Sequence, residues 1–287
     1  MKKKTEQEIT QLEKELAEYK GEDRVVSSTE IWEEYKKLPE RKRLECGFPS
    51  LDKWFNGFEV GELILVTGPA DGGKTTFLTS SLKNMSAKSI PTLLFSFEEA
   101  PQNLLKKITL EDSTPPVFYV PRQMTENTIL WMEKKIIEAK VKFNVEAVFI
   151  DNIHQIFSIN QFVKNLSLEI GDMVAYIKNI CLTHGVVIFM IAHSRDNPNK
   201  SEPVLSDIRD SGLIPRIADS AIGVWRIPNS EGVVKDGRYM SEVGPEDNKA
   251  KIRILKNRRE GTKGTCVVYH RNHFLEEQKS KDELGNW

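Results

Sequence analysis

The sequence predicts an α/β protein in which helices cover both faces of a mostly parallel sheet. Apolar runs of strand length recur along the chain, and amphipathic helical stretches separate several of them. The run 186–191 is apolar throughout, which is typical of a parallel strand buried on both faces. With 287 residues, 39% of them hydrophobic and 29% charged, the chain suits one large domain with a smaller appendage.

Hydrophobic periodicity places the individual elements along the chain. We expect helices at 5–20, 27–38, 75–85, 126–142 and 162–184. We expect strands at 63–67, 92–97, 117–120, 146–151, 186–192, 220–226, 251–256 and 265–269. The last strands lack long helices between them, so an antiparallel extension is expected at the C-terminal end.

The N-terminal segment differs in character from the rest. Helix 5–20 carries a narrow apolar stripe among Glu and Lys, which suits either a solvated terminal helix or one that docks on a neighbouring subunit. The second helix, which begins near Ser27 and stops before Pro39, is expected to turn Ile31, Tyr35 and Leu38 inward. We therefore expect a helical subunit-docking segment at 1–45, a main domain at 46–280 and a tail at 281–287.

Composition excludes several classes of protein. An uninterrupted apolar run of about 18 residues is absent, so no membrane span is indicated, and the N-terminus lacks the apolar core of a secretory signal. Three scattered cysteines favour buried thiols in a reducing compartment. The net charge of −1 means that any nucleic-acid contact must come from a local basic surface.

Residues 68–75 form the motif around which the chain is organised. They read Gly-Pro-Ala-Asp-Gly-Gly-Lys-Thr, between an expected strand and an expected helix, which is the pattern of a phosphate-binding loop. The glycines let backbone N–H groups converge on an anion, Lys74 can reach the β- and γ-phosphates, and the Thr75 hydroxyl can bind magnesium. The sequence therefore predicts a nucleoside triphosphate and Mg²⁺ as ligands. The nucleotide-binding residues assigned to the loop are Gly68, Asp71, Gly72, Gly73, Lys74, Thr75 and Thr76.

Polar residues follow three other expected strands. Asp151 ends the strand 146–151 as a Walker B acid does, and is expected to hold Mg²⁺ opposite Thr75. Glu98 follows the strand 92–97, which we expect beside the phosphate loop, and is the candidate general base, with Glu99 as the alternative. His193 follows the strand 186–192, where its side chain can either contact the γ-phosphate or be structural.

Lys256 and Arg258 form a cationic pair at the end of the strand 251–256. They either blunt a solvated edge strand or reach a neighbouring subunit's triphosphate as arginine-finger-type groups.

The order of these motifs resembles a known family. Besides the loop and the three strand ends, it includes Leu-Ser-Asp-Ile-Arg-Asp-Ser-Gly at 205–212, Ala-Asp-Ser at 218–220 and Lys-Asn-Arg at 256–258. The set is similar to the RecA-like motor domain of replicative ring helicases of the DnaB and Twinkle type. The helicase half of phage primase-helicases is the most similar. The resemblance covers about 60–280.

This resemblance implies an ATP-hydrolysing ring, usually a hexamer, that moves along single-stranded DNA and unwinds duplex during replication, in the cytoplasm of a bacterial or phage-infected cell or in an organelle matrix. By position it makes Lys74 and Glu98 catalytic, His193 the γ-phosphate sensor, and Lys256 and Arg258 groups that act in trans. It also favours docking of helix 5–20 on the next subunit, with priming and loading supplied by a separate primase or loader.

Further binding residues follow from the same resemblance. Arg226 and Tyr269 fall at ribose and base positions. The DNA-contacting loops fall at about 157–165 and 194–210, and the second contains Arg195, Lys200 and Arg209. Arg209 is equally suited to a subunit interface.

A second reading stays open. The lead-in Gly-Phe-Pro-Ser-Leu-Asp at 47–52 also resembles RecA, RadA and KaiC proteins, which act in recombination or as regulatory switches without unwinding. The Lys-Asn-Arg and Ser-Asp-Ile-Arg elements favour the helicase.

Overall fold

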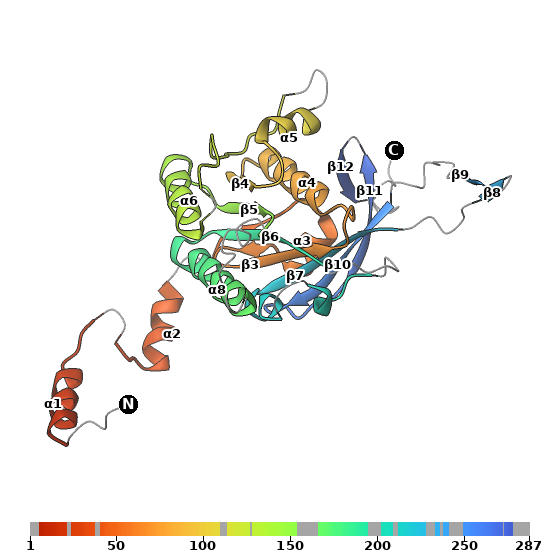
Figure 1. Ribbon diagram of the computed structural model, residues 1–287. Helices are drawn as coiled ribbons and strands as arrows, with labels where there is room; N and C mark the ends of the chain where they lie inside the picture. The colour runs from red at the N-terminus through yellow and green to blue at the C-terminus, as the bar shows by residue number, and fades with distance from the viewer. Residues whose placement is uncertain are drawn as a thin grey trace. The chain divides into compact units, whose positions relative to one another are not determined.

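An eight-stranded mixed sheet is the centre of the unit formed by residues 42–287 (Figure 1). The computed structural model describes residues 6–21, 24–37, 41–109, 114–126, 128–153, 166–194, 202–208, 212–227, 233–235, 238–240, 249–271 and 273–277. The strand order is β12-β11-β10-β7-β3-β6-β5-β4, in which β7, β3, β6, β5 and β4 are mutually parallel and β10, β11 and β12 continue the sheet antiparallel. The strands of this sheet are β3 (Leu63–Gly68), β4 (Thr92–Ser96), β5 (Ala147–Asp151), β6 (Val187–His193), β7 (Ser220–Arg226), β10 (Lys249–Asn257), β11 (Thr265–Arg271) and β12 (Phe274–Glu277).

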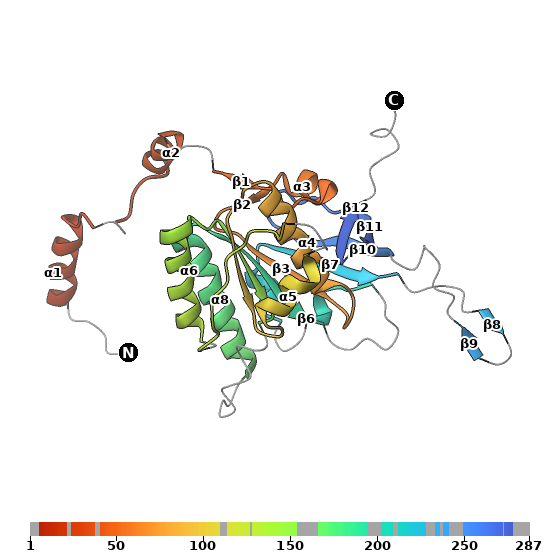
Figure 2. The ribbon, with the colours of Figure 1, turned by 90° about the horizontal axis from the view of Figure 1, so that it is seen from above.

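Helices cover both faces of the sheet, as Figure 2 shows from above. The helices of this part of the chain are α3 (Pro49–Phe55), α4 (Lys74–Ala87), α5 (Pro101–Ile108), α6 (Ile129–Phe143), α8 (Leu166–His184) and the one-turn α9 (Ile214–Ile217). Leu205–Asp207 is a 3₁₀ turn, β1 (Arg43–Leu44) pairs with β2 (Phe58–Glu59), and β8 (Val233–Lys235) pairs with β9 (Arg238–Met240).

Strand alternation divides the core into two layers. Ile64 and Val66 of β3 pack on the side of α3, α4 and α5, whereas Leu63 and Leu65 pack on the side of α6, α8 and α9. All four side chains are fully buried. The parallel strands are thus apolar on both faces, which confirms the α/β prediction and the antiparallel C-terminal extension.

Local signals set several helix ends. Thr128 caps α6, because its hydroxyl accepts a hydrogen bond from Trp131 N at 3.2 Å, and Asn144 ends the helix in the left-handed conformation. Helix α4 starts directly after Gly73, which is also left-handed, so the phosphate loop leads straight into a helix N-terminus.

Some predicted elements differ from the observed ones. The predicted strand 117–120 is wrong: only Tyr119 forms a bridge, to Leu93, along the outer side of β4. Prolines at 115, 116 and 121 explain this, since they have no N–H to donate to a ladder. Helices α3 and α5 and strand β12 were not predicted, because each is short and carries few apolar residues.

The chain separates into two compact units, 1–41 and 42–287. The first contains α1 (Glu6–Ala17) and α2 (Ser28–Lys37), and the Ser27 hydroxyl accepts a hydrogen bond from Glu30 N as the capping pattern indicates. None of the side chains of α2 is buried, so the expected inward placement of Ile31 and Tyr35 is not observed within this unit. Leu38 lies outside the described residues.

The cysteines and the helix lengths agree with the composition. All three cysteines are free and buried, which confirms the prediction of buried thiols. Among the described residues, no helix is long and apolar enough to cross a lipid bilayer.

Candidate nucleotide site

The phosphate loop joins the carboxyl end of β3 to the amino end of α4, at the centre of the sheet. Its backbone requires glycine at two places. Gly68 has φ 156°, and a Cβ there would lie 2.0 Å from the carbonyl oxygen of Val224, while Gly73 has φ 96°. The loop therefore packs closely on β7 and directs the N-terminus of α4 toward the carboxyl edge of the sheet.

Lys74 is buried beneath this loop, with 6% of its surface exposed. Its Nζ donates hydrogen bonds to the carbonyl oxygens of Gly68 at 3.1 Å and Pro69 at 2.7 Å. Burial lowers the pKa of Lys74, and the neighbouring carboxylates, first that of Asp151, oppose this shift. The ammonium group is thus held on the side of the loop where phosphates bind in proteins of this pattern.

Asp151 ends β5 and faces Thr75. The Thr75 hydroxyl donates to Asp151 Oδ2 at 2.9 Å. Burial raises the pKa of Asp151 to about 6, the hydrogen bond from Thr75 lowers it, and the charge of Glu98 raises it further. A hydroxyl and a carboxylate oxygen side by side are ligands that suit Mg²⁺.

Glu98 and His193 approach each other across the end of β5. The strand order corrects one expectation, since β4 does not lie beside the phosphate-loop strand: β6 and β5 stand between β4 and β3. His193 pairs in register with Gly68, and its Nε2 lies 3.3 Å from Glu98 Oε1. Glu99 instead pairs with Lys107 at 2.7 Å. Of the two acids, Glu98 is the one that faces the phosphate loop.

A cavity of about 420 Å³ unites these groups. Besides the loop itself, Glu98, Asp151, His193 and Arg226 line it. The structure therefore brings together residues predicted at five separate strand ends, although Asp71 and Arg226 are 155 residues apart in sequence (226 minus 71).

An adjoining cavity of about 340 Å³ shares Thr75, Thr76, Glu98 and Asp151 with the first, and His270 and His273 also line it. Burial lowers the pKa of His270, and the nearby charge of Arg226 acts in the same direction. Neither histidine was assigned a role from the sequence. The sequence did contain a signal for His270. It is two residues after Val268 and four after Cys266, both buried, so the alternation along β11 puts its side chain on the same face as theirs.

Tyr269 lies outside both cavities. It is one residue out of phase with His270, and its ring lies 5.9 Å from Lys249 Nζ and 6.0 Å from Arg271 Cζ. Of the two residues predicted to contact ribose and base, the structure brings only Arg226 to the phosphate loop.

Lys256 and Arg258 lie at the opposite end of the strands from the phosphate loop. Strand β10 runs antiparallel to β7, so Asn257 pairs with Ser220 at the amino end of β7. Lys256 Nζ donates to the carbonyl oxygens of Pro215 at 2.9 Å and Ala218 at 2.5 Å, at the end of α9. Arg258 donates to the carbonyl oxygen of Arg216 at 2.9 Å and lies 3.6 Å from an Asp219 carboxylate oxygen.

The predicted DNA-contacting residues Arg195, Lys200 and Arg209 lie outside the described residues. So does the first of the two predicted loops, 157–165. Their roles stay predictions.

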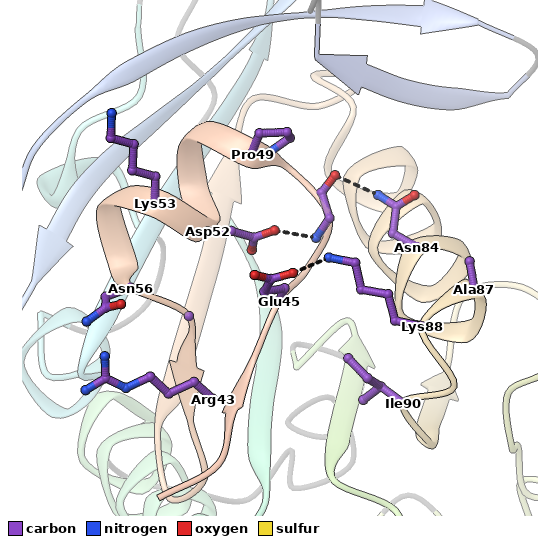
Figure 3. Close-up of a pocket in the computed structure, with 12 residues that line it drawn as sticks. Arg43, Glu45, Pro49, Asp52, Lys53, Asn56, Asn84, Ala87, Lys88 and Ile90 are labelled. Atoms are coloured by element: carbon purple, nitrogen blue, oxygen red, sulfur yellow. Dashed lines mark hydrogen bonds and ion pairs between the residues drawn. The ribbon is translucent and has the colours of Figure 1, made fainter. Parts of the chain in front are cut away.

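A larger cavity, of about 810 Å³, is unrelated to this chemistry (Figure 3). It lies at the far end of α4, where Lys88 pairs with Glu45 and the Asn84 amide donates to the Gly47 carbonyl oxygen at 3.2 Å. Asp52 also holds Gly47, by accepting its N–H at 2.9 Å. These contacts brace the start of the domain against α4, and none of the predicted site residues lines the cavity.

Comparison with known sequences assigns this arrangement to a family. The profile of the family described as "DnaB-like helicase C terminal domain" matches residues 43–117 and 118–278. The chain belongs to this family. The match confirms the resemblance to the motor domain of DnaB-type ring helicases.

Individual relatives are distant and longer. A probable replicative DNA helicase of Trieres chinensis is 25% identical over 258 residues, which cover 78% of this chain and 54% of that protein. The replicative DNA helicase DnaB of Leifsonia xyli subsp. xyli is 21% identical over 253 residues, covering 78% and 53%. The chain spans about half the length of these relatives.

Solved structures show the same fold. A structure described as an ATPase domain aligns with a TM-score of 0.69 and 18% identity, covering 88% of this chain and 97% of that one. A DnaB-like replicative helicase, solved in a study of its interactions with primase, aligns with a TM-score of 0.68 and 18% identity, covering 94% and 71%. The prediction of a RecA-like core is confirmed.

Proposed function

We propose that this chain is the ATP-hydrolysing motor of a DNA helicase that assembles as a ring, translocates on single-stranded DNA and unwinds duplex during replication. The observation that carries the proposal is the convergence of Lys74, Thr75, Asp151, Glu98 and His193 on one cavity in a member of the DnaB-like family.

Each group has a distinct task in hydrolysis. The loop N–H groups and Lys74 bind the β- and γ-phosphates. Glu98 aligns the attacking water and removes its proton, and His193 contacts the γ-phosphate. The 3.3 Å between His193 Nε2 and Glu98 Oε1 supports these two roles, because a His193 side chain that moves when the γ-phosphate leaves would also disturb Glu98.

Thr75 and Asp151 would hold Mg²⁺. Two observations support the fit. The Thr75 hydroxyl and an Asp151 carboxylate oxygen are paired, and the Asp151 carboxylate is buried. Its burial raises its pKa, and the charge of Lys74 offsets that rise only in part. When bound, the ion neutralises charge on the phosphate oxygens.

The in-trans roles of Lys256 and Arg258 find support in their location. They lie at the amino edge of the parallel strands, whereas the phosphate loop lies at the carboxyl edge, so they cannot serve their own chain's site. A neighbouring copy that presents this edge to the cavity would complete it, as a closed ring requires.

The remaining interactions extend the proposal. Helix α1 exposes Ile9, Leu12 and Leu16, and Tyr19 follows it on the same stripe, which we assign to docking on a neighbouring copy. Segment 1–45 would be this docking element, 46–280 the motor and 281–287 a tail. Arg195, Lys200 and Arg209 would contact DNA phosphates, with primase or a loader as a separate chain.

ATP hydrolysis with and without single-stranded DNA, on particles sized by mass photometry, tests the proposal. Strong stimulation by DNA on a closed ring of about six subunits is expected. DNA-independent hydrolysis or a filament would instead favour the RecA-, RadA- or KaiC-like class.

A further inference from the structure

Asn152 lies between the proposed base and the proposed sensor. It directly follows β5, the strand that stands between β4, which leads to Glu98, and β6, which ends at His193. The whole residue is 1% exposed, whereas the side chains of Glu98 and His193 are 39% and 36% exposed. The buried amide therefore has the more exposed base and sensor on either side.

Two hydrogen-bonding contacts join Asn152 to its neighbours. Its Nδ2 donates to Glu98 Oε1, and the same nitrogen lies 2.7 Å from His193 Nε2. An amide nitrogen has two N–H bonds, so it can donate to both groups at once. His193 Nε2 accepts such a bond when its ring is neutral and its proton is on Nδ1.

This arrangement decides how Glu98 and His193 communicate. While Nε2 accepts from Asn152, it and Glu98 Oε1 are both acceptors and cannot bond to each other across their 3.3 Å separation. The direct contact between His193 Nε2 and Glu98 Oε1 is then repulsive. The two side chains are held together by the hydrogen bonds that each accepts from the Asn152 amide. When Nε2 instead carries a proton, the amide must turn its oxygen toward the ring, which removes its donation to Glu98.

We propose that Asn152 is a positioning residue that holds the Glu98 carboxylate and the His193 imidazole as one unit, so that movement of His193 on the γ-phosphate repositions the base. The inference rests on the proposed function, because it takes Glu98 as the base and His193 as the γ-phosphate contact. The Asn152 amide reaches both through its two N–H bonds and is itself no part of the reacting groups.

A double-mutant cycle on the full chain separates this role from a structural one. The variants are Asn152→Ala, Glu98→Gln and their combination, with single-turnover ATP hydrolysis and the Kd of a non-hydrolysable ATP analogue as readouts. Asn84→Ala is the matched control, because this amide also donates to two acceptors, the carbonyl oxygens of Cys46 and Gly47, but at the far end of α4.

In the wild-type background, Asn152→Ala should lower turnover about 10- to 100-fold, the cost of a misplaced catalytic group, while Kd changes less than about threefold. In the Glu98→Gln background, the same substitution should change the residual rate less than about threefold, because residues that act through one another are not additive. Asn84→Ala should leave turnover unchanged.

Three results would overturn the inference: wild-type turnover in Asn152→Ala, a loss confined to Kd, or a full multiplicative loss on top of Glu98→Gln. If Asn152→Ala does not fold, Asn152→Ser keeps one hydroxyl donor and the same criteria apply to it. Unchanged turnover in Glu98→Gln alone would instead refute the proposed base, which distinguishes failure of the proposed function from failure of this inference.

Discussion

The two ends of the parallel strands differ in the groups that they carry. At the carboxyl edge, the phosphate loop, Asp151 and Glu98 surround a cavity of about 420 Å³. At the amino edge, Lys256 and Arg258 project from the end of β10, and carbonyl oxygens of the α9 segment accept their hydrogen bonds. The first edge can bind a triphosphate and supply a base, but the cations of the second edge lie out of its reach within one chain.

The difference supports the proposal that Lys256 and Arg258 act on the site of a second copy of the chain. Antiparallel pairing of β10 with β7 fixes Lys256 and Arg258 at the far edge, because Asn257 pairs with Ser220. No change of rotamer carries a side chain across the full length of a strand. The predictions below test whether the residues at the two ends of the strands have different roles in hydrolysis and stability.

The largest effect is expected from Lys74→Ala. It removes the buried ammonium group from the carboxyl edge, so ATP hydrolysis should fall below detection. A colorimetric phosphate-release assay checks this. Normal turnover would show that the phosphate loop has no role in hydrolysis and would refute the whole site.

Arg258→Ala should reduce turnover about 10³-fold while nucleotide binding stays nearly intact, since the side chain lies at the edge away from its own chain's cavity. Mixing Arg258→Ala with Glu98→Gln subunits should restore some turnover, because sites that combine an intact base with an intact arginine reappear. Mixtures that never exceed the two separate variants would contradict action in trans.

Asp151→Asn should abolish turnover yet stabilise the fold at neutral pH, by on the order of 1–3 kcal/mol. Burial raises the folded-state pKa of Asp151 from 3.8 to about 6, so its ionisation opposes folding fully above about pH 6 and not at all below about pH 3.8. The stability gain should therefore shrink as the pH falls through this window. Chemical denaturation of both proteins without Mg²⁺ at pH 7.5 and 4.5 measures it, and an equal gain at both would exclude this cause.

Lys256→Ala should have the smallest effect on stability, a loss of about 1 kcal/mol, because its ammonium group binds the carbonyl oxygens that end α9. Its proposed role in trans implies a loss of turnover as well. Lys251→Ala is the control, since this residue of the same strand makes weaker surface contacts, an exposed pair with Glu202 at 3.5 Å and a cation–π contact with the Trp225 ring at 5.9 Å. Thermal unfolding compares the two. If Lys256→Ala keeps full stability but loses turnover, its main role is in trans rather than in capping α9.

Several parts of the fold and site were predictable because they depend on local patterns. Hydrophobic runs predicted β7 with its observed bounds and most other strands of the sheet within two residues at either end. The loop motif predicted the strand–loop–helix unit around Lys74. The run at 117–120 failed because flanking prolines, not hydrophobicity, decide whether a segment can join a ladder.

By itself, the sequence determined the candidate residues for the proposed chemistry, because a phosphate loop and acids at strand ends are short motifs whose residue types suit that reaction. Only the tertiary structure decided which side chains lie next to these residues. Strand order is set by contacts between segments far apart in the chain, and it inserts β6 and β5 between the phosphate loop and the strand that leads to Glu98. It thereby places Asn152 between base and sensor, turns His270 rather than Tyr269 toward the cavity, and puts Lys256 and Arg258 at the opposite edge.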